Sequence, residues 1–533
     1  MKFNKLFKIL LVLIVLLVCL NAVAASNEMD SFGVGAEDGN LAVENNDISN
    51  ALKSSDEDVL GDGNNWYVDA GATTGGDGSQ SSPYSDLQSA LSNCNDGDVI
   101  HIMPGTYKGT SNTGLTIGVN NLAIVADDGT PVFDGENTRQ IFKITGSNVV
   151  LKGLQLTKGK TTNGGALYLD GDNICVDNCK IISNNANSGR GGGIYIADHD
   201  GISIINSMIN GNKATYFAAG IYNAGSNTLI ANCSMYNSIA HNAGGIYSNK
   251  KIKIVNSTVS SAKNDIVNTY GGGIYLQGAD ASGSLIDNVT FSSCYSDQGG
   301  AIALKDCDNI TVNNCEMSTC IGVTSKGTAS NSDGAAIWMN GKNNVISNTR
   351  VHDNAGYGYG IMYVPVSSVN TTFDNCQFYR NAVNDYHGGA IFSQADNLLI
   401  NNSYFWRNHC SKYGGAVFIL TGNNVSVLNS KFDGNYAEKG GAIYLGSRSK
   451  CKDFVADNCT FVNNGVFPKP PFDRNMTKGG AIFSIAENPT IINSNFTHNV
   501  GLMGGAIVFE NGHNTLENDT FVGNIAERYG GGA

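Results

Sequence analysis

Between residues 316 and 433 the sequence concentrates charged and aromatic side chains that could bind an acidic sugar. The set comprises Glu316, Arg350, His352, Gln377, Tyr379, Arg380, Tyr404, Trp406, Arg407, Lys431 and Asp433. Aromatic rings stack on sugar faces, and guanidinium groups hold carboxylates through paired donors. The set therefore predicts a surface that binds a polysaccharide or a glycoprotein. The alternative is an ordinary solvated face, on which Glu316 and Arg350 form a weak ion pair.

A second candidate binding region is the insertion between Gly465 and Lys478, which holds Phe467, Lys469, Phe472 and Arg474. Another insertion, between Thr319 and Asp333, follows the same position of the internal repeat described below. Both loops should therefore leave the same edge of the molecule, and loops gathered on one face of a repeat protein often bind partners. Neutral drift in a tolerant loop explains the insertions equally well.

The residues give little support for catalysis. Asp198, His199 and Asp200 could do acid–base chemistry, but they occupy a position where other repeats have turns such as Asp170-Gly171-Asp172. A lyase would want a calcium-binding carboxylate cluster with a basic residue, and a hydrolase would want facing carboxylates. Neither occurs at matching positions of adjacent repeats. No Cys-x-x-Cys pair or histidine cluster suggests zinc, so we expect no catalytic residues, no metal and no cofactor.

These side chains must be positioned by a repeat that begins at Gly164. Its first motif is Gly, then Gly or Ala, then an aliphatic anchor, usually followed by an aromatic residue. The anchors are Leu167, Ile194, Ile221, Ile246, Ile274, Ile302, Ile337, Ile361, Ile391, Val417, Ile443, Ile482 and Ile507. Their mean spacing is about 28 residues, which identifies a repeat architecture.

A second motif follows each anchor and begins with an asparagine. These thirteen residues, here termed the ladder asparagines, are Asn178, Asn206, Asn232, Asn256, Asn288, Asn314, Asn348, Asn375, Asn402, Asn429, Asn458, Asn493 and Asn518. Three residues later the occupant is always apolar. Six residues later asparagine recurs in nine repeats, at Asn184, Asn212, Asn354, Asn381, Asn408, Asn435, Asn464, Asn499 and Asn524.

Such columns are typical of a parallel β-helix, in which equivalent positions of successive coils stack about 4.8 Å apart. Stacked asparagines can pass hydrogen bonds from coil to coil, and stacked apolar residues fill the interior. A propeller blade needs a longer period, and helical repeats need a 3.6-residue periodicity. We therefore predict an all-β, single-stranded, right-handed parallel β-helix. Whether the aliphatic or the aromatic residue of each anchor motif points inward is left open.

The sequence has 13 cysteines, one of them in the N-terminal apolar stretch. Five follow a ladder asparagine (Cys179, Cys233, Cys315, Cys376 and Cys459), and no two of these lie in adjacent coils. They should be buried small residues, because a disulfide needs Cα atoms within about 7 Å. Cys294 and Cys320 share one column in adjacent coils, so we expect a disulfide between them.

Eleven Asn-x-Ser/Thr sequons occur. Five coincide with ladder asparagines, which we expect to be inaccessible after folding. Asn475, in the long loop, is the best candidate for glycosylation.

The Gly-Gly-Ala-Ile-Tyr and Asn-Ser-x-Phe-x-x-Asn motifs resemble the repeats of polymorphic outer-membrane proteins and of adhesin-like surface proteins of methanogenic archaea. The preceding stretch, from Trp66-Tyr67-Val68-Asp69 to Pro104-Gly105-Thr106-Tyr107, resembles the opening of many β-helix proteins, polysaccharide lyases included. That resemblance implies an N-terminal capping helix, at Ser85 to Ser92. It is specific for fold and surface location rather than for activity.

The N-terminus predicts secretion. Lys2, Lys5 and Lys8 precede an apolar stretch and an Ala-Val-Ala cleavage site, so residues 1–24 read as a signal peptide. Residues 25–63 read as an acidic disordered linker, residues 64–163 as the N-terminal cap and first coils, and residues 164–533 as the repeated coils, with a C-terminal part missing. The net charge of −13 argues against nucleic acid as a partner. The sequence has no second apolar run, so we expect no membrane insertion after cleavage.

These observations predict a non-enzymatic, secreted or cell-surface, adhesin-like protein. Its rod would present a lateral surface to an extracellular polysaccharide, a glycoprotein, or a neighbouring or host cell. A polysaccharide lyase or glycoside hydrolase on the same fold is the first alternative. A structural spacer of a surface layer is the second.

Overall fold

The computed structural model describes residues 63–533 except 323–331, 448–449, 466–477 and 531–533. The expected signal peptide (1–24) and all but the last residue of the expected linker (25–63) lie outside the described residues. Within the described ranges, the structure contains no helix of the length and apolarity that crossing a membrane requires.

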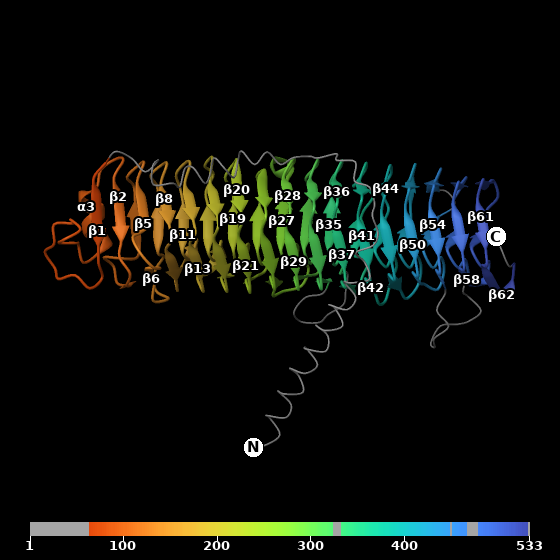
Figure 1. Cartoon of the computed structure of the whole chain (residues 1–533), viewed down its shortest axis with the longest axis horizontal. Helices are drawn as coiled ribbons and strands as arrows, with labels where there is room; N and C mark the ends of the chain where they lie inside the picture. Colours follow the sequence, from red (N-terminus) through yellow and green to blue (C-terminus); the bar gives the residue numbers. More distant parts are fainter. Residues whose placement is uncertain (1–62, 323–331, 448–449, 466–477, 531–533) are drawn as a thin grey trace, which may run out of the picture. The chain divides into compact units, whose positions relative to one another are not determined.

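The described chain is a parallel β-helix whose coils follow one another in sequence order along a single stack (Figure 1). One coil contains β12 (Cys175–Asp177), β13 (Lys180–Ile182), β14 (Asn185–Arg190) and β15 (Ile194–Ile196). Each of these strands pairs in parallel with its equivalent in the next coil. The predicted fold class is confirmed.

The coils build four long sheets, here numbered in the order in which a coil visits them. Sheet 1 has 17 strands, from β1 (Asn65–Val68) to β60 (Thr515–Glu517), and sheet 2 has 16, from β3 (Thr106–Tyr107) to β61 (Thr520–Val522). Sheet 3 has 10, from β10 (Lys160–Asn163) to β46 (His409–Cys410), and sheet 4 has 15, from β4 (Leu115–Ile117) to β59 (Ile507–Phe509).

A short helix, α3 (Leu87–Asn93), lies at the N-terminal end, close to the expected range. The carboxylate of Asp86 accepts a hydrogen bond from the Ser89 amide and so caps the helix. Leu87 and Ala90 are fully buried and join the main apolar core. The helix therefore covers the first coils, as expected.

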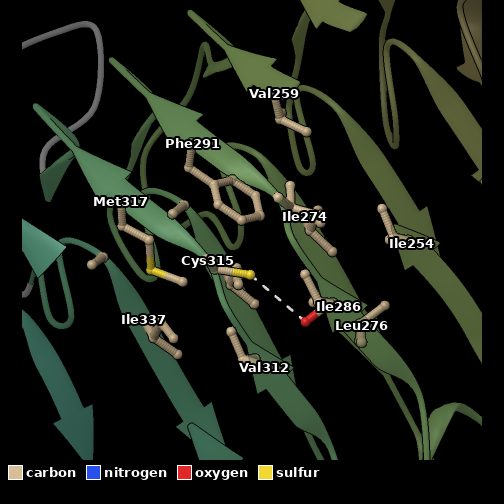
Figure 2. Close-up of a cluster of buried hydrophobic side chains, with 14 of the residues drawn as sticks. Ile254, Val259, Ile274, Leu276, Ile286, Phe291, Val312, Cys315, Met317 and Ile337 are labelled. Atoms are coloured by element: carbon tan, nitrogen blue, oxygen red, sulfur yellow. Dashed lines mark hydrogen bonds between the residues drawn. The ribbon is translucent and has the colours of Figure 1, made fainter. Parts of the chain in front are cut away.

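The core is a continuous column of inward-facing apolar side chains. In each short strand of sheets 1 and 2 the middle residue points inward, because side chains alternate along a strand. Phe378, Phe405, Phe432, Phe461 and Phe496 stack with ring centroids 4.7–4.9 Å apart. Figure 2 shows how Phe291, Met317 and Val312 meet the anchors of sheet 4 in the same interior.

The second asparagine column is buried at the corner between sheets 2 and 3. Asn354, Asn381, Asn408, Asn435 and Asn464 are at most 1% exposed. Each side-chain amide donates to the Oδ1 of the next asparagine, at 2.9–3.1 Å. Each also donates to a carbonyl of the preceding coil. The hydrogen bonds from coil to coil predicted for this column are present.

The ladder asparagines behave differently, and one expectation about them is wrong. All thirteen adopt a left-handed conformation, with φ between 48° and 56°. Asparagine tolerates this region well because its short polar side chain bonds locally. The side chains stand on the outside of the turn, where Asn288, for example, donates to Asn256 at 2.8 Å. The five sequon asparagines in this column (Asn232, Asn256, Asn288, Asn458 and Asn518) are exposed rather than inaccessible.

The structure also decides which residue of the anchor motif faces inward. The aliphatic anchors belong to the main core, whereas the following aromatics form separate clusters on the outer face of sheet 4. Tyr195 and Tyr222 stack there at 4.8 Å. Residues that precede the glycine pair, such as Tyr270 and Tyr413, pack over this outer column.

Half-buried His387 lies in one of these outer clusters and gives a prediction for pH dependence. Its ring stacks on Tyr413 at 4.8 Å, and its Nδ1 has no hydrogen-bond partner among the described residues. Burial, together with the nearby charge of Lys412, lowers the pKa of His387 to about 4. The unfolded chain binds a proton near pH 6.5 and the folded chain does not, so this contribution to stability is full above pH 6.5 and falls as the pH drops toward 4.

We expect wild type to lose about 2 kcal/mol of stability from His387 between pH 7 and pH 4, a value reduced for its partial exposure. The His387→Phe variant, which keeps the ring stack, should lack this share of the loss. Denaturation curves at both pH values give the difference. An equal loss in the two proteins would contradict a neutral histidine in the fold.

All twelve described cysteines are free thiols, and eleven are buried. The five that follow a ladder asparagine are buried small residues, as expected; Cys315 lies among core side chains with its Sγ 3.6 Å from the Ile286 carbonyl (Figure 2). Burial raises the pKa of Cys315 to about 12.

The expected disulfide between Cys294 and Cys320 is a wrong prediction, because both are free in the structure. The two residues do stack in adjacent coils, and a hydrogen bond between their thiols raises the pKa of Cys320. Cys294 and Cys320 lie between strands, at equivalent positions of coils that stack about 4.8 Å apart. A disulfide needs Cβ atoms about 3.5–4.5 Å apart, so adjacency in one column does not suffice.

This thiol chemistry is testable by labelling. Because reactive thiols are exposed and ionised, the native protein should label with a thiol-specific reagent at Cys94 at most. In a chain without the expected signal peptide, which contains Cys19, all twelve remaining cysteines should label in denaturant without reductant, counted by intact mass. Two fewer labels in denaturant would indicate that two of the thiols are joined in a disulfide.

Candidate functional site

The predicted ligand-binding residues come together on the outer face of sheet 2. All but two stand on five consecutive strands of this sheet: β33 (Glu316–Ser318), β37 (Arg350–His352), β41 (Gln377–Tyr379), β45 (Tyr404–Trp406) and β50 (Lys431–Asp433). Arg380 and Arg407 directly follow β41 and β45. Strand pairing stacks Glu316, Arg350, Gln377, Tyr404 and Lys431 in one outward column. The same pairing stacks His352, Tyr379, Trp406 and Asp433 in the other outward column.

Charged groups in this patch form an alternating row. Arg350 Nη2 donates to Glu316 Oε2 at 3.0 Å, and the other oxygen of Glu316 lies 3.0 Å from His352 Nε2. The second ring nitrogen of His352 lies 2.8 Å from Asp353 Oδ2. Arg380 closes the row with two donors to Asp353, at 2.7 and 2.6 Å.

The row shifts the pKa values of Glu316, His352, Asp353 and Arg380 in the direction that favours the charged form. Burial alone would lower the pKa of His352, but hydrogen bonds to Asp353 and Glu316 outweigh it and raise that pKa. Burial alone would raise the pKa of Asp353, but hydrogen bonds from Arg380 and His352 hold it at about 2. The hydrogen bond to His352 is the main cause that lowers the pKa of Glu316. Opposite charges at hydrogen-bond distance stabilise one another in this way.

The aromatic residues are stacked on their neighbours instead of presenting open ring faces. His352 and Tyr379 lie parallel at 4.5 Å, and Tyr379 is only 8% exposed. The Arg380 guanidinium lies 5.0 Å from the Tyr379 ring and 5.8 Å from the Trp406 ring. Arg407 lies 4.7 Å from Trp406. These contacts fix the guanidinium groups, and they leave less ring surface for sugar stacking than the sequence suggested.

A shallow groove of about 360 Å³ runs beside the row. Its lining is mostly polar and comprises Asn288, Thr290, Asn314, Cys315, Glu316, Asn348, Thr349, Arg350, Asn375 and Gln377. The groove thus spans four successive coils, at the border between the exposed ladder asparagines and sheet 2. Amides, hydroxyls and a guanidinium beside a carboxylate suit the hydroxyl and carboxyl groups of a sugar.

Sequence reasoning missed two parts of this site. The groove asparagines (Asn288, Asn314, Asn348 and Asn375) were assigned to the coil-to-coil ladder alone. Asp353 was also missed, although it occupies the same repeat position as Arg380 and Arg407. A comparison of that column from coil to coil would have found it.

Phe467, Lys469, Phe472, Arg474 and Asn475 lie outside the described residues. Both insertions start next to one column, because Ile321 in β34 (Ile321–Gly322) and Gly465 occupy equivalent positions in or beside sheet 3.

His199 lies 3.0 Å from Asp172 and 3.4 Å from Asp170, in the turns between sheets 4 and 1, as expected for a solvated turn. Across the described ranges, no group of three or more His, Cys, Asp or Glu residues could hold a metal ion.

Comparison with known families supports the fold. Residues 66–253 match the family model of the Pel9A-like right-handed β-helix region, and residues 247–432 and 319–481 match the right-handed β-helix region. The chain is thus similar to right-handed β-helix families from residue 66 to residue 481. No curated protein matches it in sequence.

Solved structures of the same architecture are distant. Pectate lyase Pel9A is 17% identical over 67% of this chain and 81% of its own, with a TM-score of 0.38. Alginate lyase AlyF-OU02, in a complex with G6, is 13% identical over 71% and 82%, with a TM-score of 0.39. Pectin methylesterase from Aspergillus niger is 14% identical over 55% and 85%, with a TM-score of 0.28. At these identities the similarity concerns the fold alone.

Proposed function

We propose that the protein is an extracellular, adhesin-like rod that binds an acidic polysaccharide along the outer face of sheet 2. The observation that carries the proposal is the polar groove lined by Glu316 and Arg350, next to a row of fixed guanidinium groups. Arg350 and Arg407 are the exposed members: the Arg350 side chain is 57% exposed and that of Arg407 is also exposed. The proposed location outside the cell depends on the signal sequence expected at residues 1–24.

Charge supports an anionic ligand. The chain as a whole carries a net charge of −13, whereas arginine and lysine outnumber carboxylates in the patch. Arg380 and Arg407 occupy the same position of successive coils, about 4.8 Å apart along the stack. The length of one sugar unit in an extended polysaccharide is close to this spacing. A uronic acid chain that lies parallel to the stack could therefore meet a donor at each coil.

The test is equilibrium binding of size-defined uronic acid oligosaccharides to Arg350→Ala and Arg407→Ala variants. A charge-assisted hydrogen bond contributes about 1.5–3 kcal/mol, so each variant should bind about 10- to 100-fold more weakly. Binding should also weaken at high salt. Lys180→Ala is the matched control, because Lys180 occupies the Arg350 position in an earlier coil of sheet 2. Equal affinity in all three variants would contradict the proposed site.

A second candidate function is cleavage of the same ligand. It is favoured by one observation, the half-buried His352 held between the carboxylates of Glu316 and Asp353. The imidazole of His352 can transfer protons if the ligand displaces one of these carboxylates. Release of reducing or unsaturated sugar ends by wild type, and its loss in His352→Asn, would establish the enzyme. Binding without any release would leave the adhesin-like function.

A further inference from the structure

The outer face of sheet 1 changes character halfway along the sheet. Along each strand, side chains face the core and the outside alternately, so the neighbours of a core-facing residue face outward. From β2 (Val99–Ile102) to β24 (Ile252–Val255) these outward positions are mostly apolar. They include Val99, Ala123, Val125, Val150, Cys175, Ile205, Leu229, Ala231 and Val255. None of these nine belongs to the main core.

Exposure differs between the two halves of this face. In the first half, Ile205 and Ala231 are 0% exposed, Val255 is 1% exposed and Leu229 is 7% exposed. In the second half, Leu285, Val345, Leu399 and Val455 occupy the Leu229 column, and all are only partly buried. The same residue types in the same column are therefore shielded in one half and not in the other. An outer sheet face of this kind requires a cover, because apolar patches that face water are unfavourable.

We propose that the outer face of sheet 1 from β2 to β24 is the docking surface for residues 50–62 of this same chain. The described chain begins at Gly63, directly before β1 (Asn65–Val68), and β1 pairs with β2 at the start of this face. The preceding residues are therefore tethered at its edge.

Length suits this occupant. Six coil steps separate β2 from β24, which corresponds to about 29 Å at 4.8 Å per step. Thirteen residues in extended conformation reach about 43 Å at 3.3 Å per residue. A tethered segment also docks at a high effective concentration, so that a modest apolar contact is enough to hold it.

Composition suits it as well. Residues 50–62 carry Leu52, Val59 and Leu60 for apolar contact, and their four acidic residues outnumber the single Lys53. The first half of the face carries Lys152 and Lys253 against one carboxylate, Asp177. The second half instead carries Asp287, Asp374, Asp457 and Glu517 in its outward columns. An acidic segment should therefore occupy the first half and avoid the second.

The experiment is hydrogen–deuterium exchange of the full chain, read by mass spectrometry for peptides within residues 50–62. Leu229→Asp places a charge in the proposed contact, and Leu399→Asp makes the same change in the same column of the second half. We expect exchange in residues 50–62 to be at least about tenfold slower in wild type and in Leu399→Asp than in Leu229→Asp. Because both leucines face outward, the core strands should keep their protection in both variants.

The proposal is overturned if residues 50–62 exchange at the unprotected rate in wild type, or if they stay protected in Leu229→Asp. Protection of the sheet 1 face that rises with protein concentration would assign the cover to a second copy of the chain instead. A Leu60→Ser variant gives an independent reading, because it weakens the contact from the segment side and leaves the sheet unchanged.

Discussion

An Asn435→Ala variant is expected to lose about 3–5 kcal/mol of stability. Asn435 is fully buried, and its Oδ1 accepts hydrogen bonds from the backbone and side-chain nitrogens of Asn408, at 2.9 and 3.1 Å. Its amide donates to the Phe405 carbonyl at 2.9 Å and to Asn464 at 3.0 Å. Alanine would leave these groups buried without partners, and each costs about 1–3 kcal/mol.

Chemical denaturation measures this loss, with exchange of the neighbouring strands as a local readout, because a stack of repeats need not unfold in one step. Asn429→Gly is the control. Asn429 is an exposed ladder asparagine with φ 50°, and glycine keeps that conformation accessible. The Asn429→Gly variant should lose less than about 1 kcal/mol of stability. Equal losses in the two variants would mean that the buried column is no more important than the exposed one.

Phe432→Ala should lower stability by about 3–5 kcal/mol, with an additional loss from broken ring stacking. Phe432 lies between Phe405 and Phe461, with centroids at 4.7 and 4.9 Å and interplanar angles of 3° and 7°. Removal of the ring opens a cavity in the interior of the stack. The coils above and below cannot close it, because their hydrogen bonds fix the coil spacing.

Phe432→Leu separates volume from stacking. Leucine fills most of the cavity, so this variant should lose less than half as much as Phe432→Ala. Thermal or chemical denaturation of the two variants and wild type gives the comparison. A loss below about 1 kcal/mol in Phe432→Ala would show that the rest of the stack compensates for a missing ring.

The candidate site was partly predictable. Once the ladder asparagines set the register, alternation along each strand placed Glu316, Arg350 and Gln377 in one outward column. The contacts within the patch were not predictable, because side-chain rotamers decide whether Arg380 meets Asp353 or solvent. The disulfide failed for a similar reason: a column fixes which residues are neighbours, whereas bond formation depends on Cβ separation below the coil spacing.

By itself the sequence determined the architecture, since a period of about 28 residues with fixed asparagine and apolar columns is satisfied by one way of stacking coils. With the small residue after each ladder asparagine taken to face inward, alternation along the strand also predicted the inward position of the phenylalanine column.

Only the tertiary structure decided that the anchor aromatics lie outside and that all ladder asparagines except the partly buried Asn206 are exposed. Both depend on the curvature of each turn, which arises from left-handed residues and packing between coils, and neither is encoded in a simple alternation of polar and apolar residues.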